Sequence, residues 1–180
     1  MKTALLIIDM LNRYDHEDAG SLAESARVAV PNIKALLDAA RERELTTVYV
    51  NDNHEEWTAG RDELTRWALD GAQPDLIDPI KPSGDVPLLV KARHSAFYAT
   101  QLEYFLRSHD IERVILTGQV TEQCILYSAL DAYIRHFQIV VPRDAVAHIH
   151  QDLGDAALRM MERNMRAVVE PTLRLSDALE

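Results

Sequence analysis

The chain has 180 residues, of which 47% are hydrophobic and 27% are charged, a balance typical of a globular protein. Its 19 lysines and arginines against 29 acidic residues give a formal net charge of −10, which argues against nucleic acids and anionic membranes as partners because both repel a net anion. No run reaches the roughly 20 apolar residues of a membrane span. We therefore expect a single domain over residues 1–180.

The N-terminus and the cysteine content favour a cytoplasmic location. The apolar stretch at residues 4–8 runs directly into Asp9 and is too short for a signal peptide. Cys124 is the only cysteine, so no internal disulfide can form, which fits a reducing compartment.

Short apolar runs alternate with segments of helical spacing along the chain. The runs are rich in Val, Ile and Leu, as is typical of strands buried on both faces of a sheet. The predicted strands are residues 4–8, 46–50, 86–90, 113–117, 138–141 and 167–169. The predicted helices are residues 22–40, with a kink or restart at Pro31, and residues 62–69, 100–107, 123–136 and 152–164. This alternation predicts a three-layer, Rossmann-like α/β fold with a central, mostly parallel sheet of six strands, and a mixed α+β domain is the alternative.

An acid, a base and the thiol each follow a predicted strand. Asp9 follows the first strand, Lys91 the third, and the loop from Gly118 to Cys124 the fourth. The ligand crevice of an open α/β sheet lies beyond the carboxyl ends of its strands, so these three residues are expected to meet there. Taken singly, Asp9 is equally well explained as a turn residue, and Lys91 is better explained as a solvated charge at a strand end.

The loop that ends at Cys124 has the features of a strand-to-helix turn. Gly118 permits a sharp turn, and Thr121 is a suitable N-cap that would place Cys124 in the first helical turn. Free backbone N–H groups and the helix dipole at that position would lower the pKa of the thiol and could bind an oxyanion. The alternative is a buried cysteine that packs as a small apolar side chain.

Three stretches together resemble the isochorismatase-like cysteine hydrolases, a superfamily that includes nicotinamidases, N-carbamoylsarcosine amidohydrolase and isochorismatase. Residues 7–12 (IIDMLN) are similar to the opening strand motif of that family, residues 91–102 (KARHSAFYATQL) to its lysine motif, and residues 118–124 (GQVTEQC) to its nucleophile loop. The resemblance covers nearly the whole chain, and it is specific because the three motifs occur in the right order and spacing.

The resemblance implies a mechanism. Asp9 would be the general base, Cys124 the nucleophile, and Lys91 would stabilise the ionised site. The thiolate would attack the carbonyl of a small amide or carbamoyl compound, the amine would leave, and water would release the thioester. The family also carries a non-proline cis peptide, here expected at Gln119–Val120, which would set the N–H groups of Val120 and Cys124 as an oxyanion hole.

The resemblance leaves the metal of the nicotinamidases without a full ligand set. Asp52 and His54 match the first pair of ligands, but no histidine lies between His54 and His94, so the second ligand expected in that region is missing. We therefore expect no cofactor and no metal, with Asp52 and His54 as the weak alternative. Candidate aromatic walls of the substrate pocket are Tyr14, Trp57, Phe97 and Tyr98, and each is equally explained by core or subunit packing.

Two other functions remain open from the sequence. One is the vinyl-ether hydrolysis of isochorismatase, with Asp9 as general acid and the cysteine dispensable. The other is a binding or scaffold protein on the same fold, which would need Cys124 to be buried and inert. For partners we expect a small-molecule substrate and, from the resemblance, a homo-oligomer of two or more subunits.

Overall fold

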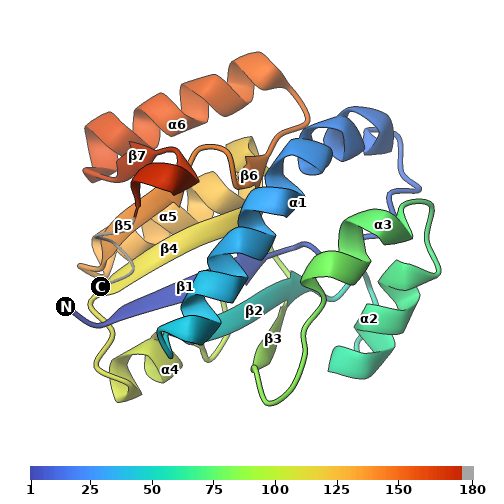
Figure 1. Cartoon of the computed structure of the whole chain (residues 1–180), viewed down its shortest axis with the longest axis horizontal. Coiled ribbons are helices and arrows are strands. Elements are labelled where there is room, and N and C mark those ends of the chain that lie inside the picture. Colours follow the sequence, from blue (N-terminus) through green and yellow to red (C-terminus); the bar gives the residue numbers. More distant parts are fainter. Residues whose placement is uncertain (176–180) are drawn as a thin grey trace.

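A computed structural model describes residues 1–175, and these form a three-layer α/β fold (Figure 1). The strands are β1 (Thr3–Ile8), β2 (Thr46–Asp52), β3 (Leu88–Lys91), β4 (Arg113–Gln119), β5 (Gln138–Pro142), β6 (Val146–Ala147) and β7 (Val168–Glu170). The α-helices are α1 (Ala19–Glu42), α2 (Arg61–Leu69), α3 (Pro74–Ile77), α4 (Leu102–Ser108), α5 (Leu126–Ile134) and α6 (Gln151–Met165). Short helical turns lie at Asp78–Ile80, Thr121–Ile125 and Thr172–Arg174.

The sheet has the order β3-β2-β1-β4-β5-β7, with β6 paired to β4, and all of these pairs are parallel. β1 lies between β2 and β4, in register Ile8 with Val50 and Ile8 with Gly118. Parallel strands with these registers end together, which brings the loops after β1, β2 and β4 to one edge. The α/β architecture predicted from the sequence is confirmed.

Alternate side chains of β1 enter two separate cores. Leu5 and Ile7 pack with α1 and α3 on one face, while Leu6 and Ile8 pack with α4, α5 and α6 on the other. All of these side chains are at most 1% exposed, so the strand is buried on both sides, as its unbroken apolar run requires.

The structure differs from the predicted elements at β6, α3 and α1. β6 is a seventh strand that the sequence did not indicate, because two residues are too few to form a hydrophobic pattern. The short helix α3 was also not predicted. Helix α1 runs through Pro31 as one element, so the predicted restart there is wrong. Its neighbours Val30 and Ile33 are buried, and their packing offsets the hydrogen bond that proline cannot make.

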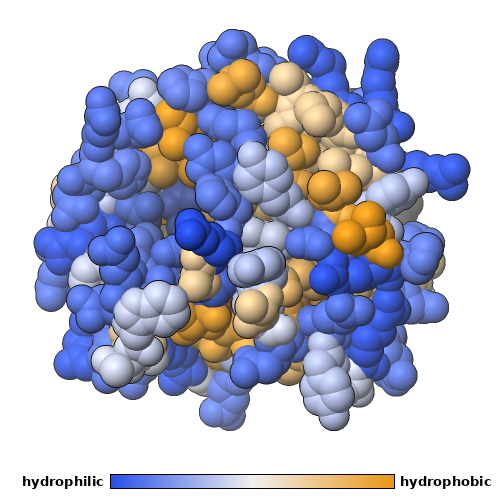
Figure 2. Space-filling model, turned by 180° about the vertical axis from the view of Figure 1, so that it is seen from behind, coloured by the Kyte–Doolittle hydropathy of each residue, from blue (hydrophilic) through white to orange (hydrophobic). Residues whose placement is uncertain are grey.

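The outer face of α5 carries an exposed apolar surface. Its large side chains are 39% to 58% exposed and comprise Tyr127, Leu130, Tyr133 and Ile134. Figure 2, seen from behind, shows apolar surface gathered among hydrophilic residues on this side of the molecule. Within residues 1–175, no helix combines the length and the apolar character that a bilayer crossing requires.

Candidate active site

The structure brings Asp9, Lys91 and Cys124 together at one edge of the sheet. Asp9 directly follows β1, Lys91 is the last residue of β3, and Cys124 lies in the helical turn after β4. Lys91 Nζ lies 2.8 Å from Asp9 Oδ2 and 3.8 Å from Cys124 Sγ. The Lys91 side chain has no exposed surface and the Asp9 side chain is 10% exposed, so this ion pair is buried. A carboxylate, an ammonium and a thiol thus form one contiguous cluster.

Hydrogen bonds to neighbouring strands hold Asp9 in place. Its φ of 56° places it in the left-handed region, which turns the chain sharply at the end of β1. Its N–H donates to Val50 O at 2.9 Å, and its Oδ1 accepts the N–H of Asp52 at 2.7 Å. Gln119 Nε2 donates to the Asp9 carbonyl at 2.8 Å. Strand β2 therefore orients the carboxylate through Asp52, while Gln119 of β4 holds the backbone of Asp9.

Gly118 allows the nucleophile loop to approach β1 closely. Its φ is +111°, and a Cβ at this position would lie 2.0 Å from Ile8 O. No side chain fits there, so only glycine is compatible with this contact. The peptide bond between Gln119 and Val120 is cis.

The turn that carries Cys124 differs from the helix predicted there. Residues Thr121–Ile125 form a π-helical turn with Val120 at its N-cap, and α5 begins only at Leu126. Thr121 is not the N-cap, because its hydroxyl donates to Ala147 O at 2.9 Å in the adjacent strand β6. The Val120 backbone hydrogen-bonds the Cys124 sulfur.

Burial and the charge of Asp9 disfavour a thiolate at Cys124 in the resting protein. Burial, followed by the negative charge of Asp9, raises the pKa of the Cys124 thiol, and Lys91 only partly offsets this effect. The prediction of a lowered thiol pKa is therefore wrong for the resting site. Burial also raises the pKa of Asp9 above its ordinary value of 3.8, against the attraction of Lys91. Burial lowers the pKa of Lys91, but the attraction of Asp9 and Cys124 outweighs it and leaves that pKa raised.

The carboxylate of Asp9 and the thiol of Cys124 line a cavity of about 350 Å³. Asp9, Cys124 and Val120 line it, together with residues that were not predicted from the sequence to form the pocket. These further lining residues are Asn12, His16, Asp18, Leu22, Ala92, Arg93, His94, Gln119, Gln123 and Ile149. Most belong to the loops after β1, β3 and β4, and their position after strand ends was the signal in the sequence that could have found them.

The four aromatic residues predicted for the pocket do not line this cavity. Tyr14 is 3% exposed and donates its hydroxyl to Gln119 Oε1 at 2.9 Å, while Phe97 is 5% exposed and packs against Phe137. Trp57 and Tyr98 are exposed and line a neighbouring cavity of about 270 Å³, which also contacts Lys91. Both cavities include Ala92, so they adjoin one another.

Asp52 and His54 both line the main cavity but are engaged with protein groups. Asp52 Oδ1 accepts the His54 N–H at 2.9 Å, and Asp52 Oδ2 lies 3.5 Å from Lys91 Nζ. The His54 ring stacks on Trp67, and its Nε2 lies 3.0 Å from Leu11 O. Among residues 1–175, no three His, Cys, Asp or Glu side chains are placed to hold a metal ion.

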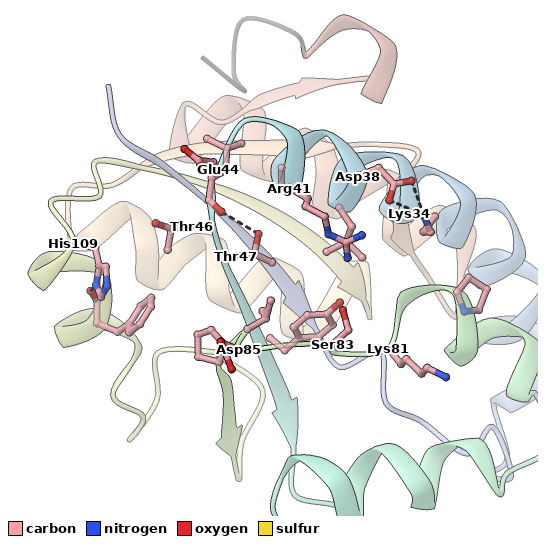
Figure 3. Close-up of a pocket in the computed structure, with 18 of the residues that line it drawn as sticks. Lys34, Asp38, Arg41, Glu44, Thr46, Thr47, Lys81, Ser83, Asp85 and His109 are labelled. Carbon is pink, nitrogen blue, oxygen red and sulfur yellow. Dashed lines mark hydrogen bonds and ion pairs between the residues drawn. The ribbon is translucent and has the colours of Figure 1, made fainter.

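A larger cavity of about 540 Å³ lies at the opposite edge, beside the first residues of β2 (Figure 3). Its charged lining includes Lys34 and Asp38, which pair with each other, and Arg41. No cysteine lines this cavity, and Ser83 is the only serine among its described lining residues. Among the described residues, Cys124 lines the smaller cavity at the carboxyl edge and not this one.

Comparison with known proteins identifies the family. The family model described as Isochorismatase domain matches residues 3–172. The chain is 33% identical to the uncharacterised isochorismatase family protein YaaI of Bacillus subtilis, over 92% of each sequence. It is 29% identical to a probable inactive nicotinamidase of Arabidopsis thaliana, over 95% of this chain and 92% of that one. It is 28% identical to maleamate amidohydrolase of Pseudomonas putida, over 87% of this chain and 78% of that one.

Solved structures agree with the sequence comparison. An isochorismatase-like hydrolase from Alkaliphilus metalliredigens superposes with a TM-score of 0.81 and 25% identity over all of both chains. N-carbamoylsarcosine amidase from Thermoplasma acidophilum gives a TM-score of 0.76 and 28% identity, over 98% of this chain and 99% of that one. Sequence, fold and the matched family model lead to the same result: the chain belongs to the isochorismatase family.

Proposed function

We propose that this protein is a cysteine-dependent hydrolase that cleaves the C–N bond of a small amide or carbamoyl-type compound. The observation that carries the proposal is the position of Lys91 Nζ, which contacts Asp9 at 2.8 Å and Cys124 at 3.8 Å beside a cavity. The cluster combines a nucleophile, a proton acceptor hydrogen-bonded to it and a cation, which is the set that acyl transfer through sulfur requires.

The first half-reaction forms a thioester. Asp9 takes the thiol proton as the sulfur of Cys124 attacks the substrate carbonyl, so the C–S bond forms as the S–H bond breaks. The backbone N–H groups of Val120 and Cys124 are proposed to donate to the oxyanion of the tetrahedral intermediate. The protonated Asp9 then gives its proton to the departing nitrogen as the C–N bond breaks.

The second half-reaction regenerates the site. Asp9, again a carboxylate, takes a proton from a water molecule that attacks the thioester, and the sulfur leaves with that proton to restore the thiol. Lys91 stays protonated throughout and stabilises whichever of Asp9 or Cys124 carries the negative charge. No step requires a metal or an organic cofactor.

The raised thiol pKa is compatible with this mechanism. A neutral resting thiol needs a base in contact, and the Asp9 carboxylate is hydrogen-bonded to it. Its raised pKa makes Asp9 a stronger base than a surface aspartate, which reduces the free-energy cost of the proton transfer.

The names of the relatives support hydrolysis of an amide, and one of them also illustrates the alternative that the protein is not an active enzyme. Maleamate amidohydrolase and N-carbamoylsarcosine amidase are named for the hydrolysis of amide and carbamoyl compounds. The relative named as a probable inactive nicotinamidase represents the alternative, a protein of this fold without turnover.

The test is ammonia release from a panel of small primary amides by the wild type, Cys124→Ala and Cys124→Ser. We expect turnover in the wild type and none in Cys124→Ala, with unchanged circular dichroism. The proposal requires that a thioester accumulates or can be trapped on Cys124, which intact-protein mass spectrometry detects. Full hydrolysis by Cys124→Ala would disprove it.

The proposed working form is a cytoplasmic homo-oligomer. The resemblance to the family suggests the assembly, and the exposed apolar side chains on α5 support it, since such a surface is commonly covered by protein. Sedimentation velocity at micromolar concentration distinguishes a monomer of 20.4 kDa from a dimer or a larger form.

A further inference from the structure

The sheet has a further cavity at its amino edge, where β4, β5 and β7 begin. Its volume is about 630 Å³, and its lining includes Arg113, Gln138 and Val168, the first residues of these three strands. Cys124 follows the opposite end of β4, and this strand of seven residues spans about 20 Å. The cavity is therefore separate from the candidate active site, and the described linings of the two share no residue.

Basic side chains outnumber acidic ones around this cavity. Its described lining holds the arginines Arg113, Arg166 and Arg174 as well as His136, and Glu170 is the only acid among these lining residues. The opposite holds at the cavity of Cys124, where the lining has three aspartates and one arginine. In a chain of net charge −10, a surplus of cations at one cavity gives a local positive potential that attracts anions from solution.

Arg166 is the cation of this group that is available to a ligand. It is exposed, and its side chain makes no hydrogen bond or ion pair within the described part of the chain. Arg113 is engaged within the protein, and Arg174 lies 3.8 Å from Glu170 Oε2. Glu170 also pairs with Arg143 at 3.9 Å, so its charge is shared between two other guanidinium groups, and it forms no ion pair with Arg166.

The floor of the cavity is apolar. Five lining residues are apolar and at most 7% exposed, namely Phe137, Ile139, Val140, Met165 and Leu175. Arg166 and Arg174 are exposed, so the cavity combines a buried apolar floor with a positively charged rim. A ligand that matches both parts has an apolar body and an anionic group at one end. A volume of about 630 Å³ restricts it to a small molecule.

We infer that this cavity binds a small organic phosphate, with its apolar body on the floor and its phosphate group against Arg166. A guanidinium donates two parallel N–H groups to phosphate oxygens, and the charge on both partners strengthens these hydrogen bonds. The three arginines of the lining come from the start of β4, the C-cap of α6 and the turn Thr172–Arg174. A tetrahedral phosphate accepts donors from such different directions, whereas a carboxylate accepts them mainly in its own plane.

Calorimetric titration of the full chain with phenyl phosphate, inorganic phosphate and phenol, at constant ionic strength, tests the inference. We expect phenyl phosphate to bind at least about tenfold more tightly than either other compound, because it alone supplies both the charge and the apolar body. Arg166→Gln weakens this binding by about 10- to 100-fold, the range that a charged hydrogen-bonded contact supplies. Cys124→Ala binds phenyl phosphate as the wild type does, since Cys124 does not line this cavity, so the result is independent of the proposed hydrolase activity.

Arg166→Gly separates binding from folding. Arg166 is the C-cap of α6 with a φ of 56°, a left-handed conformation that glycine adopts without strain. We therefore expect an unchanged or higher melting temperature in Arg166→Gly, together with the loss of phenyl phosphate binding. The control Arg159→Gln removes an exposed arginine of α6 that does not line the cavity, and it keeps the binding of the wild type.

No binding of phenyl phosphate at millimolar concentration overturns the inference, as does equal binding in Arg166→Gln and the wild type. Binding of phenol as tight as that of phenyl phosphate also overturns it, because the charge then has no part in recognition. A lipid headgroup is another source of a phosphate joined to an apolar body, and sedimentation with phosphatidic acid vesicles distinguishes it. We expect no sedimentation, since the net charge of −10 opposes approach to an anionic surface. Sedimentation that is lost in Arg166→Gln would overturn the assignment to a small molecule.

Discussion

Gln119 donates a hydrogen bond of 2.8 Å from its side-chain nitrogen to the main-chain carbonyl of Asp9, so the nucleophile loop holds the backbone of the proposed base. The same amide accepts a hydrogen bond of 2.9 Å from the buried Tyr14 hydroxyl. Gln119 is 1% exposed, which means that neither partner is easily replaced by water. The position of the Asp9 backbone therefore depends on an uncharged side chain at the end of the neighbouring strand β4.

The first prediction concerns this contact. Gln119→Leu removes both hydrogen bonds, and we expect kcat to fall by about 10- to 100-fold because Asp9 loses its alignment with the thiol. Tyr14→Phe keeps the Gln119–Asp9 bond, and we expect a fall in kcat of less than about fivefold with a loss of about 1 kcal/mol in the free energy of unfolding. Steady-state kinetics and urea denaturation measure the two effects. Equal kcat values for both variants would contradict a role for Gln119 in positioning.

A second prediction separates charge from proton transfer at Cys124. The negative charge of Asp9 raises the pKa of the thiol, so Asp9→Asn lowers that pKa while Lys91 remains beside the sulfur. We expect iodoacetamide to alkylate Cys124 faster in Asp9→Asn than in the wild type at pH 8, while amide hydrolysis is lost. Asp155→Asn, an exposed substitution on α6, serves as the control. Slower alkylation in Asp9→Asn would show that the electrostatic relationship is different.

The acid limb of the pH–rate profile provides a third prediction. Hydrolysis needs Asp9 as a carboxylate, and burial raises its pKa above the ordinary value of 3.8. Activity is therefore lost as the pH falls through a value higher than that of an exposed aspartate. The profile of kcat/KM, with circular dichroism recorded at each pH to exclude unfolding, measures this limb. A midpoint at or below pH 3.8 would contradict the assignment.

A fourth prediction concerns Gly118, the first residue of the nucleophile loop. Gly118→Ala places a Cβ at 2.0 Å from Ile8 O in a backbone conformation with φ of +111°, so we expect a loss of more than about 4 kcal/mol in stability or no soluble protein. Gly84→Ala is the matched control, because Gly84 also has positive φ (+61°) but open space around it, and we expect a loss of about 1 kcal/mol. Thermal unfolding of the two variants tests whether steric contact or backbone conformation dominates. Similar melting temperatures would contradict the steric argument.

The sequence predicts the strand ends better than it predicts their surroundings. Asp9, Lys91 and Cys124 are readable because each follows a short apolar run, and parallel strands bring their carboxyl ends together by geometry alone. Arg93 and His16 lie in the loops after β3 and β1, so the strand pattern places them at the right edge of the sheet. Which side chains of these loops face the cavity depends on contacts between distant segments, and no local pattern gives that.

Local sequence patterns also do not give the burial of a side chain. The pKa of Cys124 was predicted from its place near a helix N-terminus, but desolvation by the folded protein dominates it. Phe97 and Tyr14 are aromatic and near the site in sequence, and the fold uses both in packing. Chemical type and spacing thus locate the reacting groups, whereas the charge state of the thiol and the walls of the cavity require the three-dimensional structure.

The pairing of β1 with β4 also has a consequence for the order of events during synthesis. The residues joined by the Gln119–Asp9 contact are 110 positions apart, and Ile8 faces Gly118 across the same strands. Local helix formation cannot bring such distant segments together, so the groups of the site meet only after the central strand has found its late partner. A nascent chain that ends before β4 has no reactive centre, and the appearance of activity would report the pairing of β1 with β4.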